Sequence, residues 1–168
     1  FVNHAFSLIG KNLRIAVLRG NSPSSGIFEY KFGRLLLSSY LLSRQNILDY
    51  LKLIRKYKIN CLYVYPSSML MFCRYLKLIL EEKKIELPEI QGIISSSEIF
   101  SESAKAEIKE IFPGSTIVDI YGQSEHVAFA IAVDKGYFHF FDSYSIVEFL
   151  DTGLKNGGNS IKEIVGTN

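Results

Sequence analysis

Amphipathic segments and short apolar segments alternate along the middle of the chain. Each amphipathic segment has hydrophobic side chains at helical spacing and follows a serine suited to an N-cap. The expected caps are Ser43, Ser67 or Ser68, and Ser101. The apolar segments between and after these helices are typical of buried strands and cover residues 59–65, 90–94 and 116–120. This order predicts an α/β fold, a parallel sheet with helices on both faces.

The two ends of the chain follow other patterns. Residues 1–9 predict a helix, residues 13–18 a strand, and residues 27–30 and 35–38 two strands paired across Gly33. After residue 125, short aromatic or β-branched segments separated by turns predict an antiparallel meander. Its expected strands are residues 127–133, 137–141, 145–150 and 161–165, with a Gly/Asn-rich hairpin loop at 151–160. We expect one domain over residues 1–168, with an α/β part (1–125) and a β-rich extension (126–168).

Polar residues follow each strand of the predicted parallel sheet. Tyr65-Pro66-Ser67 follows the first strand, Ser95-Ser96-Ser97-Glu98 ends the second, and Tyr121-Gly122-Gln123-Ser124-Glu125 follows the third. Parallel strands end at the same edge, so the three segments are expected to line one crevice, where open α/β sheets bind ligands. Taken alone, the third segment is also compatible with a plain turn after a strand.

Composition narrows the classes of function. The net charge is +2 and acids and bases interleave, which argues against a nucleic-acid surface. No apolar run approaches the ~20 residues of a membrane helix. Cys61 and Cys73 form no Cys-x-x-Cys pair, so we expect free thiols and a reducing cytoplasm. The three histidines are too scattered to indicate a metal site. Residues 19–26 lack the ending of a nucleotide-triphosphate loop and predict a surface loop.

Four motifs along the chain together resemble the phenylacetate–coenzyme A ligase family of adenylate-forming (AMP-binding) enzymes. They are Ser95-Ser96-Ser97-Glu98, Asp119-Ile120-Tyr121-Gly122-Gln123-Ser124-Glu125, Tyr137-Phe138-His139 and Ile146-Val147-Glu148. Tyr-Gly-x-Ser-Glu is similar to the superfamily's Tyr-Gly-x-Thr-Glu, with serine keeping the hydroxyl. Leu18-Arg19-Gly20, Tyr65-Pro66-Ser67, and Glu125-His126 with His139 resemble the capsular polysaccharide biosynthesis branch. The resemblance covers nearly the whole chain.

The resemblance implies a chemistry and a set of residue roles. The family activates a carboxylic acid with ATP and Mg²⁺, giving an acyl-adenylate and pyrophosphate, and often passes the acyl group to coenzyme A. Glu125 would then bind Mg²⁺, and the Ser124 hydroxyl would contact a phosphate oxygen. The expected nucleotide-binding residues are Ser96, Ser97, Glu98, Ile120, Tyr121, Gly122 and Gln123. The expected residues facing the carboxylate substrate are Tyr65, Pro66 and Ser67.

The resemblance also suggests what a complete enzyme needs besides this chain. The family's phosphate loop would precede Phe1, and its ribose-binding aspartate and its catalytic lysine would follow Asn168. We therefore expect a fragment of the large domain, and we expect the isolated chain not to release pyrophosphate from ATP. The alternative is a non-catalytic nucleotide-fold module for binding or assembly in polysaccharide biosynthesis. The identity of the acid, the acceptor and a homo-oligomeric state stay open.

Overall fold

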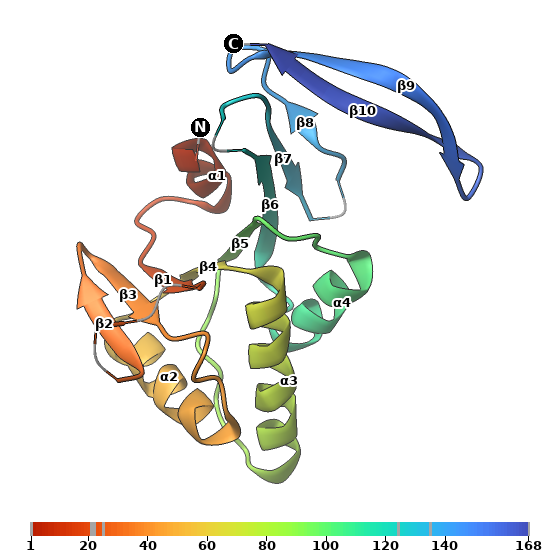
Figure 1. The fold of residues 1–168 in the computed structure, drawn as a ribbon. Coiled ribbons are helices and arrows are strands. Elements are labelled where there is room, and N and C mark those ends of the chain that lie inside the picture. Colours follow the sequence, from red (N-terminus) through yellow and green to blue (C-terminus); the bar gives the residue numbers. More distant parts are fainter. Residues whose placement is uncertain (1, 21–22, 25, 124, 135, 168) are drawn as a thin grey trace.

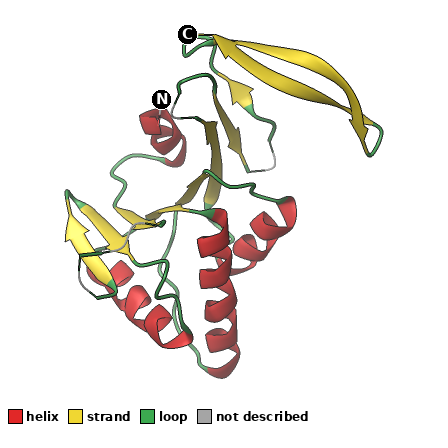
Figure 2. Ribbon diagram, in the orientation of Figure 1, coloured by secondary structure: helices red, strands yellow, loops and turns green. Residues whose placement is uncertain are grey.

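The computed structural model describes residues 2–20, 23–24, 26–123, 125–134 and 136–167. Within these residues, eight strands form one sheet in the order β2-β3-β1-β4-β5-β6-β7-β8, and two more form a separate sheet (Figures 1 and 2). The strands of the main sheet are β1 (Ile15–Leu18), β2 (Phe28–Lys31), β3 (Arg34–Leu37), β4 (Cys61–Val64), β5 (Gly92–Ser96), β6 (Thr116–Gly122), β7 (Phe129–Val133) and β8 (His139–Phe140). The predicted α/β fold class is confirmed.

The centre of this sheet is parallel. β1 pairs with β4, β4 with β5, and β5 with β6, all in parallel register. Val64 lies opposite Ser95, and Ser96 lies opposite Ile120, so these strands end together at one edge. The expected common edge is therefore confirmed. β2 and β3 pair antiparallel across Gly33, also as expected.

Alternate residues of each strand belong to two different hydrophobic clusters. Leu62, Ile93 and Ile117 face the helices α2 (Arg44–Lys56), α3 (Pro66–Glu82) and α4 (Glu102–Ile111). Cys61, Ile94 and Val118 face the opposite side, where α1 (Val2–Ile9) contacts β5 and β6. In Figures 1 and 2, α2, α3 and α4 lie on one side of the sheet and α1 lies on the other. Helices thus lie on both faces, as the strand pattern predicts.

Two of the three expected helix caps are confirmed. The side chain of Ser43 accepts a hydrogen bond from the Asn46 N–H at 3.2 Å, and Ser101 accepts one from the Ala104 N–H at 3.2 Å. The expectation for Ser67 or Ser68 is wrong, since α3 already begins at Pro66. Proline suits the first helical position because its φ is preset and its missing N–H would have no intrahelical partner there.

The C-terminal part is antiparallel, as predicted, but it does not form one continuous meander. β7 and β8 extend the main sheet antiparallel, whereas β9 (Ile146–Asn156) and β10 (Asn159–Thr167) form a ribbon of their own that projects from the sheet (Figure 1). The expected loop at 151–160 is therefore mostly strand. Gly157 and Gly158, both with positive φ, complete the turn alone, which is typical of a two-residue hairpin. The prediction from Gly/Asn composition made the loop too long, because composition carries no information about cross-strand pairing. Here the Lys162–Asp151 ion pair at 3.0 Å reinforces that pairing.

The described residues include no helix long and apolar enough to cross a membrane. Both cysteines are buried free thiols, as expected. Burial raises the pKa of each thiol to about 12, so neither is a thiolate nucleophile at neutral pH.

The close approach of α1 to β5 depends on Gly92. A Cβ at this position would overlap the side chain of Ile9. We predict that Gly92→Ala lowers the free energy of unfolding by about 1–3 kcal/mol, because overpacking forces α1 away from the sheet. Urea unfolding followed by circular dichroism measures the change.

The matched control is Gly114→Ala, where no atom lies within 4 Å of the added Cβ. Adding Ile9→Ala to the Gly92→Ala variant should restore part of the lost stability, since it removes the overlapping atoms. A Gly92→Ala protein as stable as wild type would contradict this account of α1 packing.

Candidate functional site

Two neighbouring cavities open at the edge where β5 and β6 end. We call them the Tyr121 cavity, of about 550 Å³, and the His126 cavity, of about 470 Å³. Ser97, Ile120 and Gly122 line both. The Tyr121 cavity lies on the face that α4 covers, and the His126 cavity lies on the α1 face beside Tyr63 and Phe129. A ligand of two parts can therefore occupy both faces of the sheet across one rim.

Ser96 and Ser97 form the rim between the two cavities. Ser97 has a φ of +73°, a left-handed conformation that is costly for a residue with a side chain and is often found at functional sites. Its Oγ accepts a hydrogen bond from Nη2 of Arg19 at 3.0 Å and lies 3.4 Å from the Ser96 Oγ. The structure thus brings both predicted serines to the site, and it adds Arg19, which sequence reasoning assigned to a surface loop.

Glu98 has a structural partner as well as a place in the Tyr121 cavity. Its two carboxylate oxygens accept hydrogen bonds from the backbone N–H and the hydroxyl of Ser67, each at 2.9 Å. A carboxylate is favourable at the first turn of α3 because the helix dipole is positive there. Glu98 therefore fixes the start of α3 against the loop after β5.

Of the three residues predicted to face the carboxylate substrate, Tyr65 lies against a cavity, and the other two belong to the start of α3. Pro66 is buried at the start of α3 and Ser67 is bonded to Glu98; among the described residues that line the two site cavities, neither occurs. The Tyr65 ring lies beside Arg19 and lines a third cavity of about 500 Å³, which we call the Lys31 groove. The structure thus places these three side chains next to the site rather than inside it.

Aromatic rings flank the Tyr121 cavity. Tyr121 is half-buried, and its hydroxyl accepts a hydrogen bond from the Gln123 side chain at 3.3 Å. Phe138, which lines the same cavity, lies edge-on to Tyr121 with ring centroids 6.2 Å apart. Sequence reasoning did not assign Phe138 to the site, although it stands in the aromatic segment before β8. Pairing of β8 with β7 brings this segment back toward β6.

Asp119 is a third residue that sequence reasoning missed. It is buried in β6, lines the Tyr121 cavity, and accepts a hydrogen bond from the Ser95 Oγ at 2.5 Å. Burial raises the pKa of its carboxyl, while the Ser95 hydrogen bond and the charge of Lys105 oppose the shift. The signal in the sequence was a carboxylate inside an otherwise apolar strand, a placement common at functional sites.

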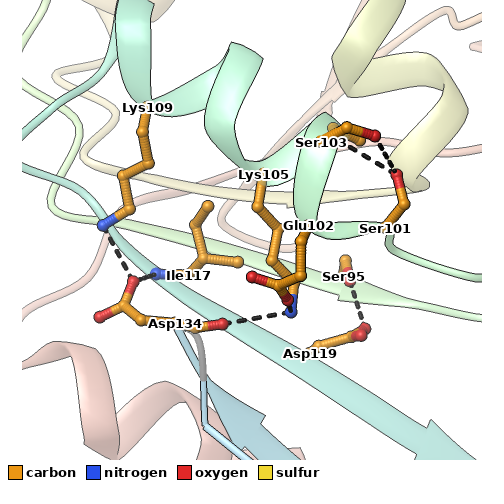
Figure 3. Close-up of polar contacts among 10 residues, drawn as sticks. Ser95, Ser101, Glu102, Ser103, Lys105, Lys109, Ile117, Asp119 and Asp134 are labelled. Atoms are coloured by element: carbon orange, nitrogen blue, oxygen red, sulfur yellow. Dashed lines mark hydrogen bonds and ion pairs between the residues drawn. The ribbon is translucent and has the colours of Figure 1, made fainter.

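Lys105 closes the side of the Tyr121 cavity next to α4. This buried lysine donates hydrogen bonds to the Glu102 carboxylate at 2.9 Å and to the backbone carbonyl of Asp134 at 3.1 Å (Figure 3). Asp134 in turn accepts from Lys109 at 2.9 Å and from the Ile117 N–H at 3.1 Å. These contacts attach α4 to the β6–β7 pair, and so hold the wall of the cavity in position.

The predicted metal ligand lies in the turn after β6. Ser124 lies outside the described residues, and Glu125 is exposed. Next to it, His126 stacks on Tyr144, with 2.9 Å between Nδ1 and the tyrosine hydroxyl. The described residues contain no cluster of three or more metal-ligating side chains. A single carboxylate, such as that of Glu125, is compatible with Mg²⁺, which commonly takes one or two carboxylates and otherwise phosphate and water oxygens.

No protein-family model matches the sequence, and no curated protein matches it. Several solved structures share its fold. CmiS6 is 18% identical over 90% of this chain and 38% of that chain, with a TM-score of 0.57. The luciferase-like enzyme from the nonluminescent Zophobas morio mealworm is 14% identical over 98% and 39%, with a TM-score of 0.55. The fatty acyl-adenylate ligase from L. pneumophila, solved with acyl adenylate and pyrophosphate, is 17% identical over 89% and 34%, with a TM-score of 0.53.

This chain spans between 34 and 39% of the length of those three proteins. At such low sequence identity the similarity establishes the fold, and a fold by itself does not determine a function. The chain therefore has the mixed α/β fold that these proteins have over the matched part.

The buried carboxyl of Asp119 should make stability depend on pH. Its pKa lies above the ordinary value of 3.8 in the folded protein, so the folded protein holds this proton where the unfolded chain releases it. The contribution of Asp119 to the free energy of unfolding therefore falls as the pH rises from about 4 through the raised pKa. We predict that the free energy of unfolding of Asp119→Asn does not show this decrease with pH. The variant is therefore expected to be more stable than wild type at neutral pH.

Urea unfolding between pH 3 and pH 7 measures this effect. Asp142→Asn, which changes an exposed aspartate, is the matched control and should follow wild type. If Asp119→Asn also follows wild type over the whole range, burial of Asp119 does not carry the predicted cost.

Proposed function

We propose that the chain is part of an ATP-dependent enzyme that activates a carboxylic acid as an acyl-adenylate. The observation that carries this proposal is the pair of cavities on opposite faces of the β5–β6 edge, joined at Ser97, Ile120 and Gly122. An acyl-adenylate has two dissimilar parts joined at a phosphate, and this site offers two dissimilar cavities joined at a polar rim. The shared fold with a fatty acyl-adenylate ligase supports the proposal by analogy.

In this proposal the nucleotide occupies the Tyr121 cavity. The rings of Tyr121 and Phe138 offer surfaces against which a base can stack. Asp119 and Glu98 are acceptors suited to the amino and hydroxyl groups of a nucleoside, and Ser97 and Gln123 stand at the rim toward the phosphates. Mg²⁺, held by Glu125 and phosphate oxygens, would supply positive charge as pyrophosphate leaves.

The acid then occupies the His126 cavity, on the α1 face. Tyr63, Phe129 and Tyr144 give this cavity an aromatic lining. We further propose, from the motifs in the sequence, a phenylacetate–coenzyme A ligase-like enzyme of the capsular polysaccharide branch, with coenzyme A as one candidate acyl acceptor. These finer assignments rest on the resemblance alone.

Nucleotide binding tests the first half of the proposal. We predict that Tyr121→Ala weakens the affinity for ATP and AMP about tenfold or more, because stacking on an aromatic side chain is worth about 1–3 kcal/mol. Isothermal titration calorimetry on the whole gene product measures the affinity.

The control for this experiment is Tyr137→Ala. Tyr137 is 88% exposed and is not among the described residues that line the Tyr121 cavity. Its substitution should leave nucleotide affinity within about twofold of wild type, a change of about 0.4 kcal/mol. Equal losses in both variants would argue against the Tyr121 cavity as the nucleotide site.

The carboxylate of Glu125 tests the second half. Glu125→Gln keeps the size of the side chain and removes the charge that Mg²⁺ needs, so we predict that adenylation slows about a hundredfold, roughly 3 kcal/mol in the transition state. Steady-state pyrophosphate release by the whole gene product, at varied ATP and Mg²⁺, measures the rate.

Glu89→Gln is the control, since Glu89 is exposed and precedes β5 at the opposite edge of the sheet. Normal turnover by a folded Glu125→Gln protein would exclude Glu125 as the metal ligand. Nucleotide binding without any pyrophosphate release, by wild type or variant, would instead favour the non-catalytic module.

A further inference from the structure

Arg19 is held at the site by two aromatic rings. It follows β1 at the edge where β4, β5 and β6 also end, and it is half-buried. Its guanidinium lies over the rings of Tyr63 and Tyr65, 4.3 Å and 4.6 Å from their centroids. Such cation–π contacts are strengthened where water is excluded. We call these three side chains the Arg19 clamp.

The guanidinium in the Arg19 clamp has no carboxylate partner among the described residues. Among the described residues, Arg44 and Arg74 each form an ion pair with a glutamate, whereas Arg19 and the three exposed arginines, Arg14, Arg34 and Arg55, form none. Of these four, Arg19 is the half-buried one. A guanidinium has five N–H donors, and Ser97 is the only acceptor that the described side chains offer to it. A partly buried cation in this condition favours an anionic ligand that completes its hydrogen bonds.

The charged side chains that line the cavities also favour an anion beside Arg19. Arg19 and Tyr63 line both the His126 cavity and the Lys31 groove, which also includes Lys31 and Arg34. Among the described residues, no carboxylate lines either space. The Tyr121 cavity, by contrast, includes three carboxylates, Glu98, Glu102 and Asp119, and one cation, Lys105, which is paired with Glu102. An anion is therefore favoured on the α1 face, where the proposed function puts the acid.

We propose that Arg19 binds a second carboxylate of the acid, remote from the one that is activated, so that dicarboxylic acids are the substrate class. In adenylation, a carboxylate oxygen bonds to the α-phosphorus of ATP, the bond from this phosphorus to its bridging oxygen breaks, and pyrophosphate leaves. The reacting carboxylate thereby loses its charge. An arginine bound to it would stabilise the substrate more than the transition state, which slows the step. A second carboxylate keeps its charge throughout and suits the planar fork of arginine.

This inference rests on the proposed function, and its test compares acids matched in length. Pyrophosphate exchange by the whole gene product is measured with hexanedioate against hexanoate, and with butanedioate against butanoate. We expect wild type to have at least a tenfold higher kcat/KM for a dicarboxylate than for its partner. Arg19→Gln should lower this ratio at least tenfold, and Arg19→Lys should retain part of it as a point charge. Arg14→Gln, an exposed arginine that precedes β1, should leave the ratio unchanged.

Each other outcome has a defined meaning. A wild-type preference for the monocarboxylates, or an equal loss for both acids in Arg19→Gln, overturns the inference while the proposed function stands. If none of these acids supports pyrophosphate exchange, the proposed function fails. In that case, calorimetric titration of hexanedioate tests whether Arg19 binds an anion. Binding by wild type that is lost in Arg19→Gln supports the anion site. Equal affinity, or no binding, in both proteins overturns it. Circular dichroism confirms folding. If Arg19→Gln does not fold, Arg19→Lys replaces it, and a dicarboxylate preference equal to that of wild type in Arg19→Lys then overturns the inference.

Discussion

The parallel register between β5 and β6 is the constraint on which the site depends. It places Ser95 opposite Asp119 and Ser96 opposite Ile120, so the two polar segments that follow these strands leave the sheet side by side. The buried Ser95–Asp119 hydrogen bond reinforces this register beyond the backbone ladder. A shift by one residue would turn Asp119 and Tyr121 to the opposite face and separate them from α4, because successive strand residues point to opposite faces.

Residues at the edge of the sheet combine structural and candidate functional roles. Glu98 fixes the start of α3 through Ser67, and Lys105 attaches α4 to the β6–β7 pair, yet both line the Tyr121 cavity. The same contacts that stabilise the fold therefore shape the cavity and hold its polar groups in place. This arrangement gives a preorganised wall on the α4 side of the cavity.

The α1 face has a different character. Aromatic rings and the cation Arg19 line the His126 cavity, while Glu98, Glu102 and Asp119 line the Tyr121 cavity on the α4 face. The sheet thus separates two environments that meet at Ser97, Ile120 and Gly122. Separation of this kind lets one site accept a ligand whose two ends differ in charge and shape, because each end meets complementary groups.

Hydrophobic periodicity by itself determined the α/β class, the parallel centre of the sheet and the shared edge of three strands, since a buried parallel sheet requires this alternation. It also located Ser96, Ser97 and Tyr121 beside a cavity. It did not locate Arg19, Asp119 or Phe138, which join the site through contacts between residues distant in the chain. Local pattern likewise misplaced the start of α3 and the loop at 151–160, because Glu98 and cross-strand pairing act from outside those segments. Only the tertiary structure decided which polar side chains face a cavity and which serve as caps, because strand register and the faces of the sheet are set by pairing and not by local composition.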